Sequence, residues 1–117
     1  MTLHGSTAID RLRLEGSRPR PDDVSRVLGN DRRRAVLRHV LETDGEVAVR
    51  TLAGRIADAE YDATLGSTLL EQRQRVHEAL RRTHLPLLES YGFVEYERLR
   101  GLVVPAARLS ELESALE

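Results

Sequence analysis

The sequence contains no cysteine, no tryptophan and no lysine. Without cysteine the chain forms no disulfide, carries no thiol nucleophile and offers no thiolate ligand to zinc. Long apolar runs are also missing: none approaches the roughly 18 residues that a membrane-spanning helix needs. The first residues lack the apolar core of a signal peptide. We therefore expect a cytoplasmic protein without membrane contact.

Aromatic residues are scarce, at 3% of the 117 residues, whereas hydrophobic residues make up 40% and charged residues 32%. The core must therefore be built from leucine, valine, isoleucine and alanine. This length and composition are typical of one globular domain with a single modest core.

Because lysine is absent, all 18 basic residues are arginine, and the formal net charge is −1. A GC-rich genome also produces such a bias, so the bias alone identifies no partner. Guanidinium nevertheless binds phosphate and guanine edges better than an ammonium group does. The charge is uneven: residues 67–84 carry four arginines against two glutamates, whereas residues 85–97 carry three acids and no base. A local excess of positive charge can guide DNA binding by a chain that is nearly neutral overall.

Hydrophobic periodicity and capping residues divide the chain into an N-terminal arm, a central domain and a C-terminal helix. We expect a flexible arm over residues 1–20, a domain over residues 21–104 and an amphipathic helix over residues 105–117. Within the domain the pattern predicts helices at 21–28, 31–43, 51–60 and 69–90, an extended piece at 46–49 and a β-hairpin over 93–104 with its turn at 98–101. This order of elements predicts a fold that is mainly α with a small β-hairpin, an α+β winged helix-turn-helix.

Pro86 lies inside the last helical pattern of the domain. A proline there removes a backbone hydrogen bond and should bend the helix near Arg82. Alternatively, Thr83 could cap a separate helix with Pro86 in its first turn, which would turn His84 outward. The sequence leaves both possibilities open.

Three stretches in the expected order resemble ArsR-like winged-helix regulators. DRRRAVLRHVLE (residues 31–42) resembles their first helix, RTLAGRIA (50–57) their second, and THLPLLESYGFVEYERLRG (83–101) the end of their recognition helix and their wing. LGNDRRRAVLRHV together with RVHEALRRTHLP is similar to a group of haloarchaeal winged-helix proteins. The resemblance covers about residues 22–104 and implies a DNA-binding transcription regulator. The cysteine and histidine ligand patterns of ArsR-type metal sensors are absent.

No residue pattern indicates catalysis, a cofactor or a metal site. The histidines lie beside no serine or carboxylate in a catalytic motif, and no glycine-rich phosphate loop is present. His77 and His84 are seven residues apart, too far along a helix to chelate one ion. We expect both to be hydrogen-bonded residues at the edge of the core, and we expect no enzymatic activity.

The helix over residues 69–90 is the expected recognition helix. Its apolar stripe comprises Leu69, Val76, Leu80, Leu87 and Tyr91, with Leu70 and Leu88 on one flank. Arg75 and Arg82 project from the opposite side, with Gln74 and Arg81 beside them, as major-groove recognition requires. The alternative is an ordinary solvated surface held by the pairs Glu71–Arg75 and Glu78–Arg82.

Arg98 and Arg100 lie in the hairpin turn, where a wing meets the DNA backbone or minor groove. We therefore predict double-stranded DNA as the partner, contacted by Gln74, Arg75, Arg81, Arg82, Arg98 and Arg100. The alternative is a winged-helix protein-interaction module without DNA affinity. A homodimer is expected, since two copies would read two half-sites. Leu109, Leu112 and Leu116 would form its seam or else pack on their own domain.

Three consecutive arginines, Arg32, Arg33 and Arg34, occupy the first turn of the predicted helix 31–43. Cations are unfavourable there because the helix dipole is positive at that end. We expect at least one of them to pair with an acid from a neighbouring element and so to support the fold, while another could contact a DNA phosphate.

Overall fold

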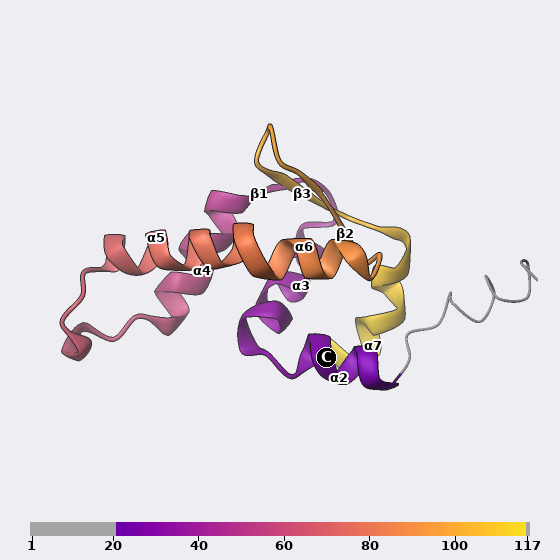
Figure 1. The fold of residues 1–117 in the computed structure, drawn as a ribbon, viewed down its shortest axis with the longest axis horizontal. Coiled ribbons are helices and arrows are strands. Elements are labelled where there is room, and N and C mark those ends of the chain that lie inside the picture. Colours follow the sequence, from indigo (N-terminus) through magenta and orange to yellow (C-terminus); the bar gives the residue numbers. More distant parts are fainter. Residues whose placement is uncertain (1–20, 117) are drawn as a thin grey trace, which may run out of the picture.

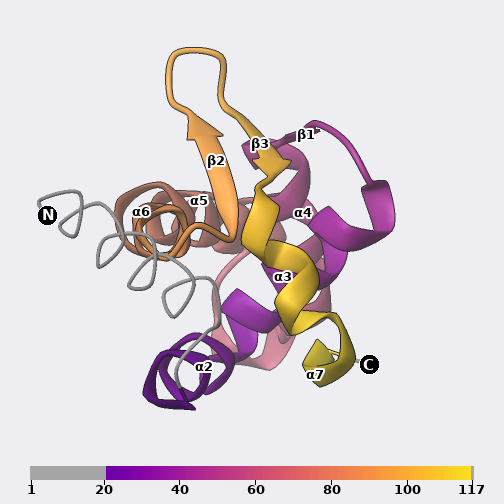
Figure 2. The same ribbon diagram turned by 90° about the vertical axis from the view of Figure 1, so that its right-hand side faces the viewer.

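The computed structural model describes residues 21–116, so the predicted arm over residues 1–20 lies outside the described residues. The described chain is an α+β fold, mostly helical with a small antiparallel sheet (Figures 1 and 2). Its elements are α2 (Pro21–Leu28), α3 (Asp31–Thr43), β1 (Val47–Ala48), α4 (Val49–Glu60), η1 (Ala63–Leu65), α5 (Leu69–Ala79), η2 (Leu80–His84), α6 (Leu85–Ser90), β2 (Val94–Glu97), β3 (Leu102–Pro105), η3 (Ala107–Leu112) and α7 (Glu113–Leu116).

The predicted ends of α3 are confirmed by the capping contacts. The Asn30 side chain accepts a hydrogen bond from the Arg33 backbone N–H at 3.1 Å, satisfying a donor that the first turn leaves free. Asp44 ends the helix in the left-handed conformation, with φ of 52°, and its N–H donates to the Val40 carbonyl.

The predicted hairpin is present as β2 and β3, and β1 adds a third strand. The strand order is β1-β3-β2, with Val103 opposite Val47 on one side and opposite Tyr96 on the other. The hairpin projects well beyond the helices (Figures 1 and 2). The Val49 N–H donates to the Gly101 carbonyl at 2.9 Å, which ties the start of α4 to the base of the hairpin turn.

Helices α4 and α5 pack along each other and are joined by the predicted loop, which contains η1 (Figure 1). Thr68 begins α5 with a capping box: its hydroxyl accepts the Glu71 N–H, and the Glu71 carboxylate accepts the Thr68 N–H at 2.7 Å. The Glu71 side chain therefore caps the N-terminal end of α5.

The segment around Pro86 matches the second predicted alternative only in part, because Pro86 lies in the first turn of a separate helix, α6, but Thr83 does not cap it. Residues Leu80–His84 form a π-helical turn that links α5 and α6 into one rod (Figure 1). The Leu85 N–H donates to the Leu80 carbonyl, five residues back, and Pro86 needs no donor in the first turn of α6. Thr83 caps no helix, and His84 points into the protein.

The π-turn also changes which residues of the rod face the core. Its wider turn carries Leu85 to the side of Leu80, so Leu85 and Leu88 are fully buried, while Leu87 and Tyr91 are only partly buried. The expectation that Leu70 flanks the apolar stripe is wrong, because Leu70 is 65% exposed.

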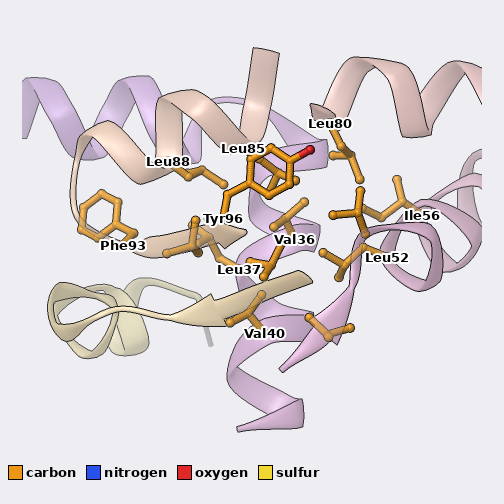
Figure 3. Packing of buried hydrophobic residues seen from close by; sticks show 14 of the residues in the cluster. Val36, Leu37, Val40, Leu52, Ile56, Leu80, Leu85, Leu88, Phe93 and Tyr96 are labelled. Carbon is orange, nitrogen blue, oxygen red and sulfur yellow. The ribbon is translucent and has the colours of Figure 1, made fainter. Parts of the chain in front are cut away.

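One core joins the helices to the sheet (Figure 3). Val36 and Leu37 of α3, Leu52 of α4 and Leu80 converge with Tyr96 of β2. The predicted C-terminal helix is a 3₁₀ segment followed by the single turn of α7. Its apolar residues are buried in the core of their own chain, namely Leu109, Leu112 and Leu116. No helix in the described range is long and apolar enough to cross a membrane.

Candidate nucleic-acid interface

The outer side of α5 carries the exposed residues Gln74 and Arg75. The rotation of the helix is fixed by Val76 and Leu80, which are fully buried against the other helices. In the described part of the chain Arg75 forms no ion pair. The Glu71–Arg75 pair of the alternative interpretation, an ordinary solvated surface, is absent because the Glu71 carboxylate caps the helix instead. That capping contact lowers the pKa of Glu71, and the nearby charge of Arg75 lowers it further.

Arg81 and Arg82 share the carboxylate of Glu78. Nη2 of Arg81 lies 3.0 Å from each carboxylate oxygen, and Nε of Arg82 pairs with Oε2. The hydrogen bond from Arg81 is the main reason why the pKa of Glu78 is lowered, and the charges of both arginines add to it. The Glu78–Arg82 pair, which belongs to the alternative interpretation of an ordinary solvated surface, is therefore present. Arg82 remains 71% exposed and Arg81 nearly half exposed.

The two arginines of the hairpin turn also have acidic neighbours. Arg98 lies 3.4 Å from Glu89 and stacks 4.9 Å above the ring centre of Tyr96. Arg100 lies 3.1 Å from Glu97 and 3.8 Å from Glu46. Both arginines are more than half exposed. Contacts between such exposed charges stabilise a fold by about 0–1 kcal/mol and are easily exchanged for other partners.

Three hollows adjoin one another along α5, and one of them reaches the hairpin. One of about 600 Å³ lies between α4 and α5 and is lined by Arg50, Gln74, His77 and Glu78, among others. A smaller one of about 270 Å³ continues from Arg50 and His77 to Arg100 in the hairpin turn. On the other side of Gln74 and Glu78, a third hollow reaches Arg75 and Arg82. Gln74, Arg75, Arg82 and Arg100 therefore border one continuous surface formed by these hollows, whereas Arg81 and Arg98 line none of the three.

Sequence reasoning missed the residues at the centre of this surface, Arg50, Thr51 and His77. Arg50 and Thr51 lie in the first turn of α4, which begins two residues earlier than the periodicity predicts. The sequence did contain an indication of their position, since Arg50 and Thr51 begin the stretch RTLAGRIA, which resembles the second helix of winged-helix regulators. His77 is partly buried, as expected of a residue at the edge of the core, and it also lines two of the hollows.

The other predicted histidine, His84, is a buried and hydrogen-bonded residue, as expected. Its Nδ1 accepts a hydrogen bond from Nε of Arg33 at 3.2 Å. Burial lowers the pKa of His84, and the charges of Arg33 and Arg32 lower it further. The imidazole is therefore mainly neutral at pH 7 and belongs to the scaffold that joins the π-turn to α3.

The three consecutive arginines of α3 all bind their own chain. Arg32 forms a two-pronged contact with Glu60 of α4, with Nη2 at 2.8 Å and Nε at 2.9 Å from the two oxygens. Arg33 also donates to the Arg26 carbonyl. Arg34 donates to the Leu28 carbonyl and pairs with Asp31. The predicted structural role is confirmed, and it extends to all three side chains.

No group of three or more potential metal ligands is present within residues 21–116. The hollows along α5 are rich in arginine, whose N–H donors can bind acceptor groups.

The architecture is that of a small α+β domain that presents one helix and one hairpin on the same surface. The model of a domain of unknown function, DUF7344, matches residues 25–104, and the chain belongs to this family. The matched range contains every predicted contact residue and ends before η3 and α7. No curated protein and no solved structure matches the chain.

Proposed function

We propose that this protein is a DNA-binding transcription regulator with a winged helix-turn-helix fold. In this proposal α4 and α5 form the helix-turn-helix, α5 enters the major groove, and the hairpin β2–β3 is the wing. The supporting observation is the continuous surface that runs from Arg100 across Arg50 and His77 to Arg75 and Arg82.

The charge of this surface favours a polyanionic partner. The three hollows are lined by five arginines and two glutamates, whereas the whole chain has a net charge of −1. These arginines are Arg50, Arg73, Arg75, Arg82 and Arg100. Arg73 pairs with Asp58, Arg82 with Glu78 and Arg100 with Glu97. Within the described residues Arg50 and Arg75 have no acidic partner, so these two are best placed to meet phosphates or base edges.

The residues divide into two roles by their position. Gln74, Arg75, Arg81 and Arg82 lie on α5 and its π-turn, where Gln can pair with adenine and Arg with guanine in the major groove. Arg98 and Arg100 lie in the turn of the projecting hairpin and would contact the backbone or the minor groove. Arg50, at the start of α4, would bind a phosphate between these two regions.

A homodimer in the cytoplasm belongs to the same proposal, because two copies would place two α5 helices on two half-sites. Its seam would not be formed by Leu109, Leu112 and Leu116, since these residues are buried within their own chain. Sedimentation equilibrium with and without a palindromic duplex would test the oligomeric state.

Binding to a random-sequence duplex, measured by fluorescence anisotropy over a series of salt concentrations, tests the function. A DNA-binding protein should lose affinity steeply with salt, with a slope of roughly −0.9 for each phosphate contacted. Substitution of Arg50 by alanine should make the slope shallower. The matched control is Arg108→Ala, because Arg108 lies against Phe93 and the Tyr91 carbonyl, away from the surface. Absence of duplex binding at low salt would instead favour a protein-interaction module.

A further inference from the structure

Glu78 is the acidic residue at the centre of the proposed recognition surface. It lines two of the three hollows, and its carboxylate contacts both Arg81 and Arg82. The sequence pattern gives Glu78 only a part in an ordinary surface ion pair. Its position between two predicted base-reading side chains gives it a further role.

We propose that Glu78 is a specificity-determining residue, which keeps Arg81 and Arg82 from binding phosphates while leaving them able to bind guanine. This inference rests on the proposed DNA-binding function. A phosphate is an anion, so it competes with the Glu78 carboxylate for the guanidinium charge and is repelled by that carboxylate. Guanine presents two neutral acceptors, O6 and N7, and meets no such competition.

The contacts of the two arginines are compatible with this discrimination. A guanidinium has five N–H donors, and Glu78 engages only part of them. Arg82 contacts Glu78 through Nε, the nitrogen nearest its backbone, so its terminal nitrogens lie farther out along the side chain. Arg81 contacts both carboxylate oxygens through Nη2. Glu78 can therefore stay in place and orient the arginines while their remaining donors bind a base edge.

Because Glu78 lies at the surface, a single substitution can remove its proposed effect on phosphate binding by Arg81 and Arg82. Glu78 is less than half exposed and caps no helix, and its partners are surface side chains, so Glu78→Gln should fold normally. Glutamine has the same size but lacks the negative charge. The freed guanidinium charge should then neutralise phosphates on any sequence.

The experiment compares wild type and Glu78→Gln on a random duplex and on a duplex selected in vitro with the wild-type protein. We expect Glu78→Gln to bind the random duplex about three- to tenfold more tightly at low salt, with a salt slope more negative by roughly 0.9. Affinity for the selected duplex should change less, so the specificity ratio should fall. Glu113→Gln on α7 removes the same charge from an exposed site elsewhere and should leave both affinities unchanged.

A second comparison shows whether Glu78 acts through the arginines. In an Arg81→Ala, Arg82→Ala background, Glu78→Gln should lose at least half of its gain in random-duplex affinity. An equal gain in both backgrounds would overturn the proposal, as would an unchanged specificity ratio. A loss confined to the selected duplex would mean that Glu78 itself contacts a base, and would also overturn it. If the wild type binds no duplex, the proposed function fails; if it binds and Glu78→Gln has no effect, only the role of Glu78 fails.

Discussion

His84 and Arg33 join the π-turn to α3 through a hydrogen bond in which the imidazole Nδ1 is the acceptor, 3.2 Å from Nε. An imidazole can accept this bond only when Nδ1 carries no proton, so the contact requires neutral His84. The bond anchors the rod at the point where the backbone departs from α-helical geometry. It therefore connects the protonation of one side chain to the support of the proposed recognition helix.

The first prediction concerns pH. Burial, followed by the charges of Arg33 and Arg32, lowers the pKa of His84, so the unfolded chain binds a proton more readily than the folded chain. The stabilisation that neutral His84 contributes is fully present above the pKa of histidine in the unfolded chain, about 6.5. It is lost as the pH falls through the lower pKa that His84 has in the folded chain. The free energy of unfolding, measured with urea between pH 7.5 and pH 5, should therefore decrease.

The control for this prediction is His84→Gln, which retains a hydrogen-bond acceptor but does not titrate in this range. Its free energy of unfolding should depend less on pH than that of the wild type between the same limits. Equal pH dependence of the two proteins would show that His84 contributes nothing to the titration.

The second prediction concerns Glu60, which links three helices. It accepts hydrogen bonds from Arg32 of α3 and, at 3.1 Å, from Gln72 of α5, and its side chain is 30% exposed. Glu60→Gln should lower the free energy of unfolding by about 1 kcal/mol, because it removes a charged, two-pronged interaction. Asp58→Asn is the matched control, since its pair with Arg73 is about half exposed, and it should change stability by less than about 0.5 kcal/mol. Equal effects in chemical denaturation would contradict the assigned role of Glu60.

Local signals in the sequence predicted most elements of the fold. Asn30 and Asp44 mark the ends of α3. Gly92, directly before the hairpin, and Gly101, in the predicted hairpin turn, both adopt positive φ. The third strand β1 was predicted only as an extended piece, because its pairing with Val103 joins segments that are far apart in sequence.

The errors have a common physical cause. Pro86 indicated an interruption, but the choice of a π-turn depends on the packing of Leu85 and His84 against α3, which periodicity does not contain. A regular spacing of 100° per residue therefore fails beyond Leu80. In the candidate site, the arginines were correctly predicted to be exposed, while Arg50 and His77 were missed because they approach the hairpin only in the folded chain.

The third prediction tests the revised core. Leu112 is buried in the 3₁₀ segment, whereas Leu70 on α5 is largely exposed. Leu112→Ala should cost about 2–5 kcal/mol because it leaves a cavity in the core. Leu70→Ala should change stability by less than about 0.5 kcal/mol. The free energies of unfolding of the two variants, measured in urea, should thus differ clearly. A similar loss in both variants would contradict the burial of Leu112 and the exposure of Leu70.

The fourth prediction concerns the hairpin turn. Replacing Arg98 and Arg100 by alanine should weaken binding to all duplexes alike, because interactions with the DNA backbone carry no direct sequence information. The salt slope should become shallower by roughly 0.9 for each phosphate that the variant no longer binds. Leu99→Ala serves as the control in the same turn, since Leu99 is fully exposed and uncharged. If the double variant lacking Arg98 and Arg100 kept the affinity and the salt slope of the wild type, the proposed contact between the hairpin and DNA would be refuted.

The fifth prediction concerns α5, the proposed recognition helix. Replacing Arg75 and Arg82 by alanine should abolish sequence preference, because each pairing with a guanine contributes about 1–3 kcal/mol of discrimination. The thermal midpoint should stay nearly unchanged, since both side chains are exposed and neither packs in the core. Arg32→Ala should have the opposite effect, because it removes the ion pair with Glu60. It should lower the thermal midpoint without changing sequence preference. A large fall in the midpoint of the Arg75 and Arg82 variant would mean that this side of α5 supports the fold rather than reading DNA.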